Sequence, residues 1–206
     1  MIVTISRQLG SGGLFIGKAI AEAIGAEFLD ERTLVNRSAK RLAMPEEYLE
    51  SIDERPKTIS ESLLSDLARA SGIIVPVKVN APDAELFDTV REIVAEASQH
   101  GHVVVIGHGG PSLVAPFSKK CPTFHILVHA NFAWRVARIS ERFHLNSDDA
   151  KKRILQTDPA RERYVAAHAR TNMYDAHEYD LTIDTGHIGI EVAAAIAVEA
   201  VRAALG

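Results

Sequence analysis

The chain has 206 residues, 47% hydrophobic and 24% charged, with a formal net charge of −4. This length and balance suit one domain with a buried core, and they argue against a general nucleic-acid or membrane-surface binder. The only cysteine is Cys121, which excludes an internal disulfide and a zinc cluster of thiols. The segment MIVTISRQ lacks the apolar region of a signal peptide, and no apolar run is long enough to cross a bilayer. We therefore expect a cytoplasmic globular protein.

The first half of the chain begins with an alternation of strand and helix. Residues 2–5 are apolar and β-branched and are followed by glycines, which is typical of a buried parallel strand. From Leu14 to Ile24 apolar residues recur at every fourth position, which predicts a helix that ends at Gly25. A short strand is predicted over residues 27–30, and residues 31 to about 70 have a charged helical pattern interrupted by prolines.

The second half continues the alternation after an irregular connection at residues 73–82. The predicted helices cover residues 85–99, 132–143, 148–155 with Ser147 as the N-cap, and 188–205, and the predicted strands cover 103–106, 124–128 and 181–184. Strands that alternate with helices favour a parallel α/β sheet.

The segment between the first strand and its helix is rich in glycine. A strand, a tight turn and a helix N-terminus together form an anion site, because backbone N–H groups converge there and the helix dipole adds roughly half a positive charge. A plain βα turn also favours glycine, but the run Gly10-Ser11-Gly12-Gly13 is longer than a turn needs. The pattern therefore favours a site for phosphate.

The P-loop pattern G-x-x-x-x-G-K-[ST] fits this segment only in part. The register that ends at Gly12 has Gly13 in place of the lysine and Leu14 in place of the serine or threonine. A second register makes Lys18 the lysine but puts it inside the predicted helix, where a solvated role is more typical.

A Rossmann dinucleotide fingerprint is the competing interpretation. Gly10-x-Gly12 is present and Asp30 ends the second strand, but Phe15 stands where the third glycine belongs. The spacing of the glycines therefore leaves a nucleotide site and a dinucleotide site both open.

Five segments, taken in order, resemble the cytidylate kinase-like family, relatives of bacterial cytidylate kinase. They are ISRQLGSGGLFIGKAIAEAIGAEFLDERTL, VVVIGHGG, FHILVHANFAWRVARISER, TDPARERY and YDLTIDTGHIGIE. The resemblance is weak from about residue 40 to residue 84. A glycine loop without a lysine is characteristic of this family, so Gly13 agrees with it.

The resemblance implies a three-layer P-loop nucleoside monophosphate kinase-like fold with a five-stranded parallel sheet. The core would comprise residues 1–30, 86–140 and 173–206, with an acceptor-binding insertion at 31–85 and a mobile lid at 141–172. The implied reaction is transfer of the γ-phosphoryl group of ATP, with Mg²⁺, to a nucleoside monophosphate, by default CMP or dCMP. Small nucleotides would be the partners, and no metal-ligating residue is singled out.

The resemblance also suggests which residues hold the donor. The loop residues Gly10, Ser11, Gly12, Gly13 and Leu14 would bind the ATP phosphates. Arg7 could supply charge that a lysine normally gives, or it could be a solvated surface residue. Arg135, Arg138 and Arg142 share one helix face through their spacing. They form either a solvated face or, as the resemblance implies, a face toward ATP.

The candidate catalytic residues are arginines, because the planar guanidinium matches phosphate. Arg161 and Arg163 match the D-x-x-R segment of the lid, and Arg138 lies on the helix that leads into it. Asp158 is expected to orient Arg161 or Arg163.

Asp30, Arg37 and His108 are the candidate residues for the acceptor. Asp30 could instead cap the following helix, and Arg32 is an alternative to Arg37. His108 stands where the family usually has an arginine, which leaves the acceptor open. His108 thus leaves open a different small acceptor or a non-catalytic nucleotide-sensing protein. The glycine spacing leaves open a nicotinamide-dependent oxidoreductase.

Overall fold

The computed structural model describes residues 1–43, 82–169 and 171–206. The irregular connection and most of the acceptor-binding insertion that the sequence predicts fall within residues 44–81 and lie outside the described residues.

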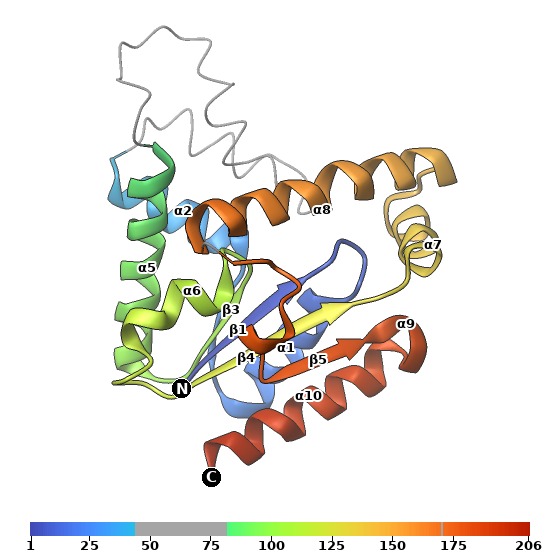
Figure 1. Ribbon diagram of the computed structural model, residues 1–206. Helices are drawn as coiled ribbons and strands as arrows, with labels where there is room; N and C mark the ends of the chain where they lie inside the picture. Colours follow the sequence, from blue (N-terminus) through green and yellow to red (C-terminus); the bar gives the residue numbers. More distant parts are fainter. Residues whose placement is uncertain (44–81, 170) are drawn as a thin grey trace, which may run out of the picture.

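The described residues build a five-stranded sheet in which every paired strand is parallel (Figure 1). The strands are β1 (Ile2–Arg7), β2 (Glu27–Leu29), β3 (Val103–Ile106), β4 (Thr123–His129) and β5 (Leu181–Asp184). Their order is β2-β3-β1-β4-β5, which confirms the predicted sheet. The dinucleotide-binding fold has the order 3-2-1-4-5-6, so the Rossmann interpretation is wrong.

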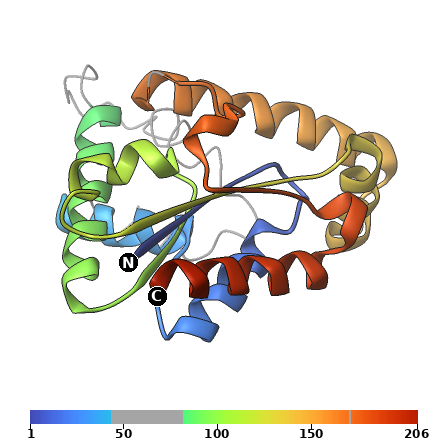
Figure 2. The ribbon, with the colours of Figure 1, turned by 60° about the horizontal axis from the view of Figure 1, so that its bottom comes forward.

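Helices cover both faces of the sheet, which gives the predicted three layers (Figures 1 and 2). The helices are α1 (Gly13–Ile24), α2 (Glu31–Arg41), α5 (Pro82–His100), α6 (Gly110–Val114), α7 (Phe132–Phe143), α8 (Ser147–Ala169), α9 (Thr185–Ile188) and α10 (Ile190–Leu205), with short 3-10 turns at Ala115–Phe117 and Ala176–Glu178. The helices α1 and α10 pack on one face, and α2, α5 and α6 pack on the other. Helix α8 crosses above the sheet, over the ends at which the strands finish (Figure 1).

The core is apolar on both faces because alternate residues of β1 point in opposite directions. Val3 and Ile5 pack with α1 and α10. Ile2 packs with α5 and α6. The N–H at Gly25 bonds to the carbonyl of Ala21 with a left-handed φ of 62°, which ends α1 as predicted.

Helix α8 differs most from its predicted form. The sequence predicted an end at Leu155, but the helix continues to Ala169 with Pro159 inside it. A proline removes one N–H and frees the carbonyl four residues earlier, here that of Leu155, which is exposed and can meet water. The N-cap is Asn146 and not Ser147, because the Asn146 side chain accepts the N–H of Asp149 at 2.9 Å.

The closing helix also differs from its prediction. The helix predicted over residues 188–205 begins at Ile190 as α10, and Gly189, with a φ of 83°, separates it from the short helix α9, which was not predicted. The resulting turn brings Thr185, at the start of α9, to the glycine loop, where its hydroxyl donates to the carbonyl of Ser11 at 2.7 Å.

Candidate functional site

The glycine loop joins the end of β1 to the start of α1. Gly10 and Gly12 have φ values of 85° and 90°, which glycine adopts readily. Gly12 is the N-cap of α1, and its carbonyl accepts the N–H groups of Phe15 and Ile16. The first N–H groups of a helix have no acceptor within the helix, so this loop presents donors at the positive end of α1. The strand, the glycine turn and the helix N-terminus on which the predicted anion site depends thus follow one another as expected.

The loop is held in place by Ser11 and Leu9. The buried hydroxyl of Ser11 lies 2.9 Å from the carbonyl of Gln8 and 3.0 Å from that of Val128. The N–H of Leu9 donates to Asp158 Oδ1 at 2.8 Å. The Ser11 side chain therefore serves the loop itself, and the backbone N–H of Ser11, predicted to bind phosphate, donates to the carbonyl of Gln8 at 3.3 Å.

Arg7 is not a solvated surface residue. It lies directly before the loop, and its Nη2 donates to Glu31 Oε2 at 2.8 Å, with 12% and 13% of the two side chains exposed. Arg161 Nη1 donates to the backbone carbonyl of Arg7 at 3.0 Å. Two arginines and a glutamate therefore meet beside the loop, from β1, α8 and the first turn of α2.

Asp158 joins the loop to a buried arginine. Arg135 Nη1 donates to Asp158 Oδ2 at 2.5 Å and to the carbonyl of Leu9 at 3.1 Å. Arg161 Nη1 lies 3.9 Å from Asp158 Oδ1. Asp158 thus lies within ion-pair distance of Arg161, one of the two arginines it was predicted to orient, but its short contact is with Arg135.

Burial is the main cause of the pKa shifts of Arg161 and Asp158. Desolvation lowers the pKa of Arg161 well below its usual range, the charge of Arg7 adds to this, and Glu31 opposes it. Desolvation also raises the pKa of Asp158, against the effect of the Leu9 N–H and the Arg135 guanidinium. A buried charged group is stabilised when an ion of opposite charge binds beside it, and for the cationic Arg161 that ion is an anion.

The other candidate arginines lie in different environments. The Arg138 guanidinium stacks at 5.0 Å over the ring of Trp134, and that of Arg142 lies 5.5 Å from the ring of Phe143. Arg163 is exposed on α8. These three are therefore not gathered with Arg135 around the loop.

The candidate acceptor residues are similarly divided. Asp30 caps α2, and its Oδ1 accepts both the N–H and the hydroxyl of Thr33, at 2.9 and 2.7 Å. Arg37 forms an exposed ion pair with Glu27 at 2.5 Å. The capping alternative for Asp30 is thus confirmed. Its other carboxylate oxygen, Oδ2, takes no part in these two hydrogen bonds.

His108 is buried in the turn after β3 with a φ of 56°, which is uncommon for a residue other than glycine. Within the described part of the chain its Nε2 has no hydrogen-bond partner. Desolvation lowers its pKa, Glu31 acts against this, and Arg7 adds to it. The imidazole is therefore neutral near pH 7 and does not replace the charge of an arginine.

His108 lies at the end of a group of ring contacts that sequence reasoning missed. Its ring lies edge-on to Tyr164 at 6.2 Å, and His168 contacts both Tyr164 and Phe87, at 4.5 and 4.9 Å. These residues come from α5, the turn after β3, and α8. No sequence signal joins them, because the first and last are about 80 positions apart.

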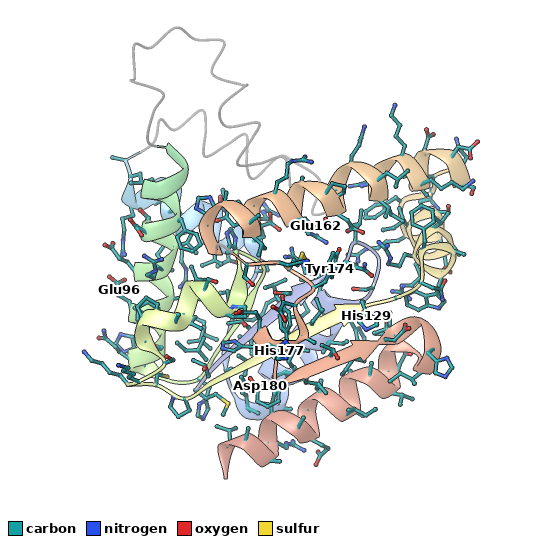
Figure 3. All side chains as sticks on the ribbon, in the orientation of Figure 1. Glu96, His129, Glu162, Tyr174, His177 and Asp180 are labelled. Atoms are coloured by element: carbon teal, nitrogen blue, oxygen red, sulfur yellow. The ribbon has the colours of Figure 1, made fainter. Side chains whose placement is uncertain are left out.

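Tyr174 and Glu162 form a second contact that the sequence did not reveal. The Tyr174 hydroxyl donates to Glu162 at 3.1 Å, and the two side chains lie together beneath α8 (Figure 3). Burial raises the pKa of Tyr174 to about 12. The segment after α8 is thus tied to the helix next to Arg161.

In residues 1–43, 82–169 and 171–206, no group of three or more histidine, cysteine, aspartate or glutamate side chains is arranged to hold a metal ion. The helices within these ranges include none that is long and apolar enough to span a membrane.

Comparison with known proteins gives a consistent result. The model of the "Cytidylate kinase-like family" matches residues 2–187. The cytidylate kinase of Pyrobaculum islandicum is 26% identical over 153 residues, which cover 73% of this chain and 81% of that protein.

Solved structures show the same fold. An uncharacterized protein from Eubacterium ventriosum has a TM-score of 0.71 at 18% identity, and the match covers 98% of each chain. A shikimate kinase from Bacteroides thetaiotaomicron has a TM-score of 0.53 at 12% identity, covering 100% of this chain and 98% of that one.

Proposed function

Because the chain belongs to the cytidylate kinase-like family, we propose that it transfers the γ-phosphoryl group of ATP to a small acceptor, by default CMP or dCMP. The observation that carries this proposal is the junction of the glycine loop with Arg7, Arg135 and Arg161. Such a junction combines backbone donors with guanidinium groups, which phosphoryl transfer needs for positioning and for charge neutralisation.

In the proposed reaction the bond between the γ-phosphorus and the bridging oxygen of ADP breaks, and a bond to an acceptor oxygen forms. The N–H groups at the start of α1 hold the donor phosphates. Arg161 neutralises negative charge on the transferring group, because its buried guanidinium lies beside the loop and an arriving anion offsets the cost of that burial. Asp158 fixes Arg135 and Leu9 and so keeps the loop in one conformation.

Mg²⁺ is part of the proposal because it would neutralise charge that develops during phosphoryl transfer. Leu14 has no hydroxyl for the metal, and that of Ser11 lies against two backbone carbonyls. Asp30 is the carboxylate that we propose would hold the metal, through Oδ2, because its two hydrogen bonds to Thr33 both use Oδ1. Mg²⁺ commonly keeps several waters and one or two carboxylates, so this donor set suffices.

A non-catalytic nucleotide-binding protein is the second candidate. It is favoured by His108, which is buried and neutral and so provides no fixed charge for an acceptor phosphate. A different small acceptor, without a phosphate at that place, would fit the same observation.

The test is ADP release by the purified protein with ATP and Mg²⁺, with CMP, dCMP, UMP, AMP and GMP offered separately. Release with CMP or dCMP and not with the others supports the default acceptor. ATP binding without release in any of these mixtures would refute nucleoside monophosphate transfer and favour a sensor or another acceptor.

Arg161→Ala should lower kcat more than it weakens ATP binding, because an interaction made mainly in the transition state appears in kcat. We expect a loss of about 10²-fold or more in kcat, the scale for removing one charge-stabilising donor. Lys18→Ala is the control, since Lys18 is exposed on α1, and it should change neither quantity. Equal losses in kcat and in ATP affinity for Arg161→Ala would place this arginine in ground-state binding.

A further inference from the structure

The position at which a P-loop has its lysine is glycine here, and the structure shows what fills the space beside it. An ideal Cβ on Gly13 would lie 2.8 Å from Cβ of Arg7 and 3.1 Å from its Cγ. Side-chain carbons do not approach so closely in folded proteins, so the stem of Arg7 excludes a lysine at position 13.

The Arg7 side chain continues from Gly13 toward the end of β3. An ideal Cβ on Gly107 would come within 2.2 Å of Arg7 Nη1. Gly107 has a φ of 85°, so glycine is required there for two reasons, the backbone conformation and the space that the guanidinium takes. Glycines on both sides thus make a passage that an arginine from β1 occupies.

The guanidinium of Arg7 ends in an ion pair that remains partly open to solvent. Its Nη2 donates to Glu31 Oε2 at 2.8 Å, and about one eighth of each side chain is exposed, 12% and 13%. Glu31 stands in the first turn of α2, and the glycine loop starts directly after Arg7. An anion that enters at the loop therefore meets a cation whose present partner is one exchangeable carboxylate.

We propose that Arg7 supplies, from the end of β1, the positive charge that a P-loop lysine supplies from the start of the following helix, and that Glu31 is the counter-ion displaced by the donor polyphosphate. This inference rests on the proposed function for its ligand, which is the triphosphate of a nucleotide. Lys18 is not a competing source of the charge, because it lies exposed on α1, a full turn beyond the loop.

The spatial part of the proposal can be tested without any ligand. Gly13→Ala should destabilise the protein, because the new methyl group meets the stem of Arg7. The same substitution should cost much less in an Arg7→Gly/Glu31→Gln background, because glycine removes both the Cβ and the Cγ of Arg7 and no unpaired carboxylate remains. Urea unfolding of the four proteins measures the coupling. Equal costs of Gly13→Ala in both backgrounds would overturn the inferred overlap.

The charge part is tested with inorganic tripolyphosphate and with ATP, by calorimetry at one fixed salt concentration. Glu31→Gln should tighten binding by up to about tenfold, because Arg7 is then free for phosphate. Arg7→Met/Glu31→Gln should lose that gain and weaken binding at least about tenfold relative to Glu31→Gln. Glu199→Gln and Arg202→Met are the matched controls, since these residues form an exposed ion pair at 3.0 Å on α10, and both should leave affinity unchanged.

A transplanted lysine gives the decisive comparison. Adding Gly13→Lys to the Arg7→Gly/Glu31→Gln protein should restore tripolyphosphate affinity, because the lysine then has room and reaches the same phosphates. Binding that is insensitive to Arg7→Met/Glu31→Gln would overturn this inference and leave the proposed function intact. Failure of the unaltered protein to bind either ATP or tripolyphosphate would overturn the proposed function as well.

Discussion

Asp158 is the residue on which the geometry of the loop depends, because it binds Arg135 and the N–H of Leu9 together. Asp158→Ala leaves the Arg135 guanidinium buried without its carboxylate. Breaking a buried pair in this way costs about 3–5 kcal/mol of unfolding free energy, measured by urea denaturation. Asp148→Ala removes a carboxylate that is 92% exposed on the same helix and should cost less than about 0.5 kcal/mol. Similar losses for both variants would contradict the inferred role of Asp158.

His108 makes a contribution to stability that depends on pH. Burial lowers its pKa in the folded state below the ordinary value of 6.5, so the unfolded chain binds more protons. The contribution is therefore complete above pH 6.5 and decreases as the pH falls below that value. His125 is shifted in the same direction by burial. Unfolding free energy measured from pH 8 to pH 5 should fall less steeply in His108→Asn, which tolerates the left-handed backbone. An unchanged slope would contradict a buried, neutral His108.

The sequence predicted the part of the site that is formed by backbone groups better than the part that is formed by side chains. The run from Gly10 to Gly13 carries its own signal, because glycines before a helix indicate a phosphate loop. The pair of Arg7 and Glu31 and the pair of Arg135 and Asp158 join positions 24 and 23 residues apart, and single-sequence patterns do not encode such contacts. The sequence therefore named Arg7, Arg135 and Arg161 among its candidates but could not separate them from Arg138, Arg142 and Arg163.

At the scale of elements, α1 fits its neighbours through a glycine in its interior. An ideal Cβ on Gly17 would lie 2.5 Å from Cδ1 of Ile106 and 3.1 Å from Cδ1 of Ile5. Alanine normally favours a helix over glycine by up to about 1 kcal/mol. Here Gly17→Ala should instead destabilise by about 1–3 kcal/mol, because the methyl group overpacks the core between α1 and the sheet.

Gly101→Ala is the control for that substitution. An ideal Cβ on Gly101 meets no atom within 4 Å, so this variant should keep the midpoint of thermal unfolding. A stabilised Gly17→Ala protein would mean that helix α1 stands farther from β3 than the structure places it.

The predictability of the elements followed their hydrophobic pattern. Strands such as β3 are continuous apolar runs, and the pattern gave them nearly to the residue. Helix α8 was predicted too short, because a proline usually ends a helix and only tertiary packing shows that Pro159 does not. Helix α6 was not predicted at all, since five residues hold too little periodicity. Arg161 and Tyr164 thus stand on a helix that the sequence did not extend to them.

At the scale of the whole molecule, the proposed site for the donor phosphates lies at the carboxyl end of the central strand β1, where α1, α2 and α8 meet it (Figures 1 and 2). The overall fold could be predicted because strands and helices alternate along most of the chain, and the family because five separate segments resemble it. The acceptor could not, because it depends on the side chains around His108 and on the chemistry of a ligand.

The most direct test is amide hydrogen exchange of the complete protein with and without ATP and Mg²⁺, resolved to single residues by NMR. We expect ATP to slow exchange of the N–H groups from Gly10 to Leu14 and to shift the guanidinium resonances of Arg7 and Arg161. Inorganic tripolyphosphate should give the same pattern, because the phosphates carry the contact. If saturating ATP leaves these amides and guanidinium groups unchanged while other residues respond, the donor phosphates do not bind at the glycine loop.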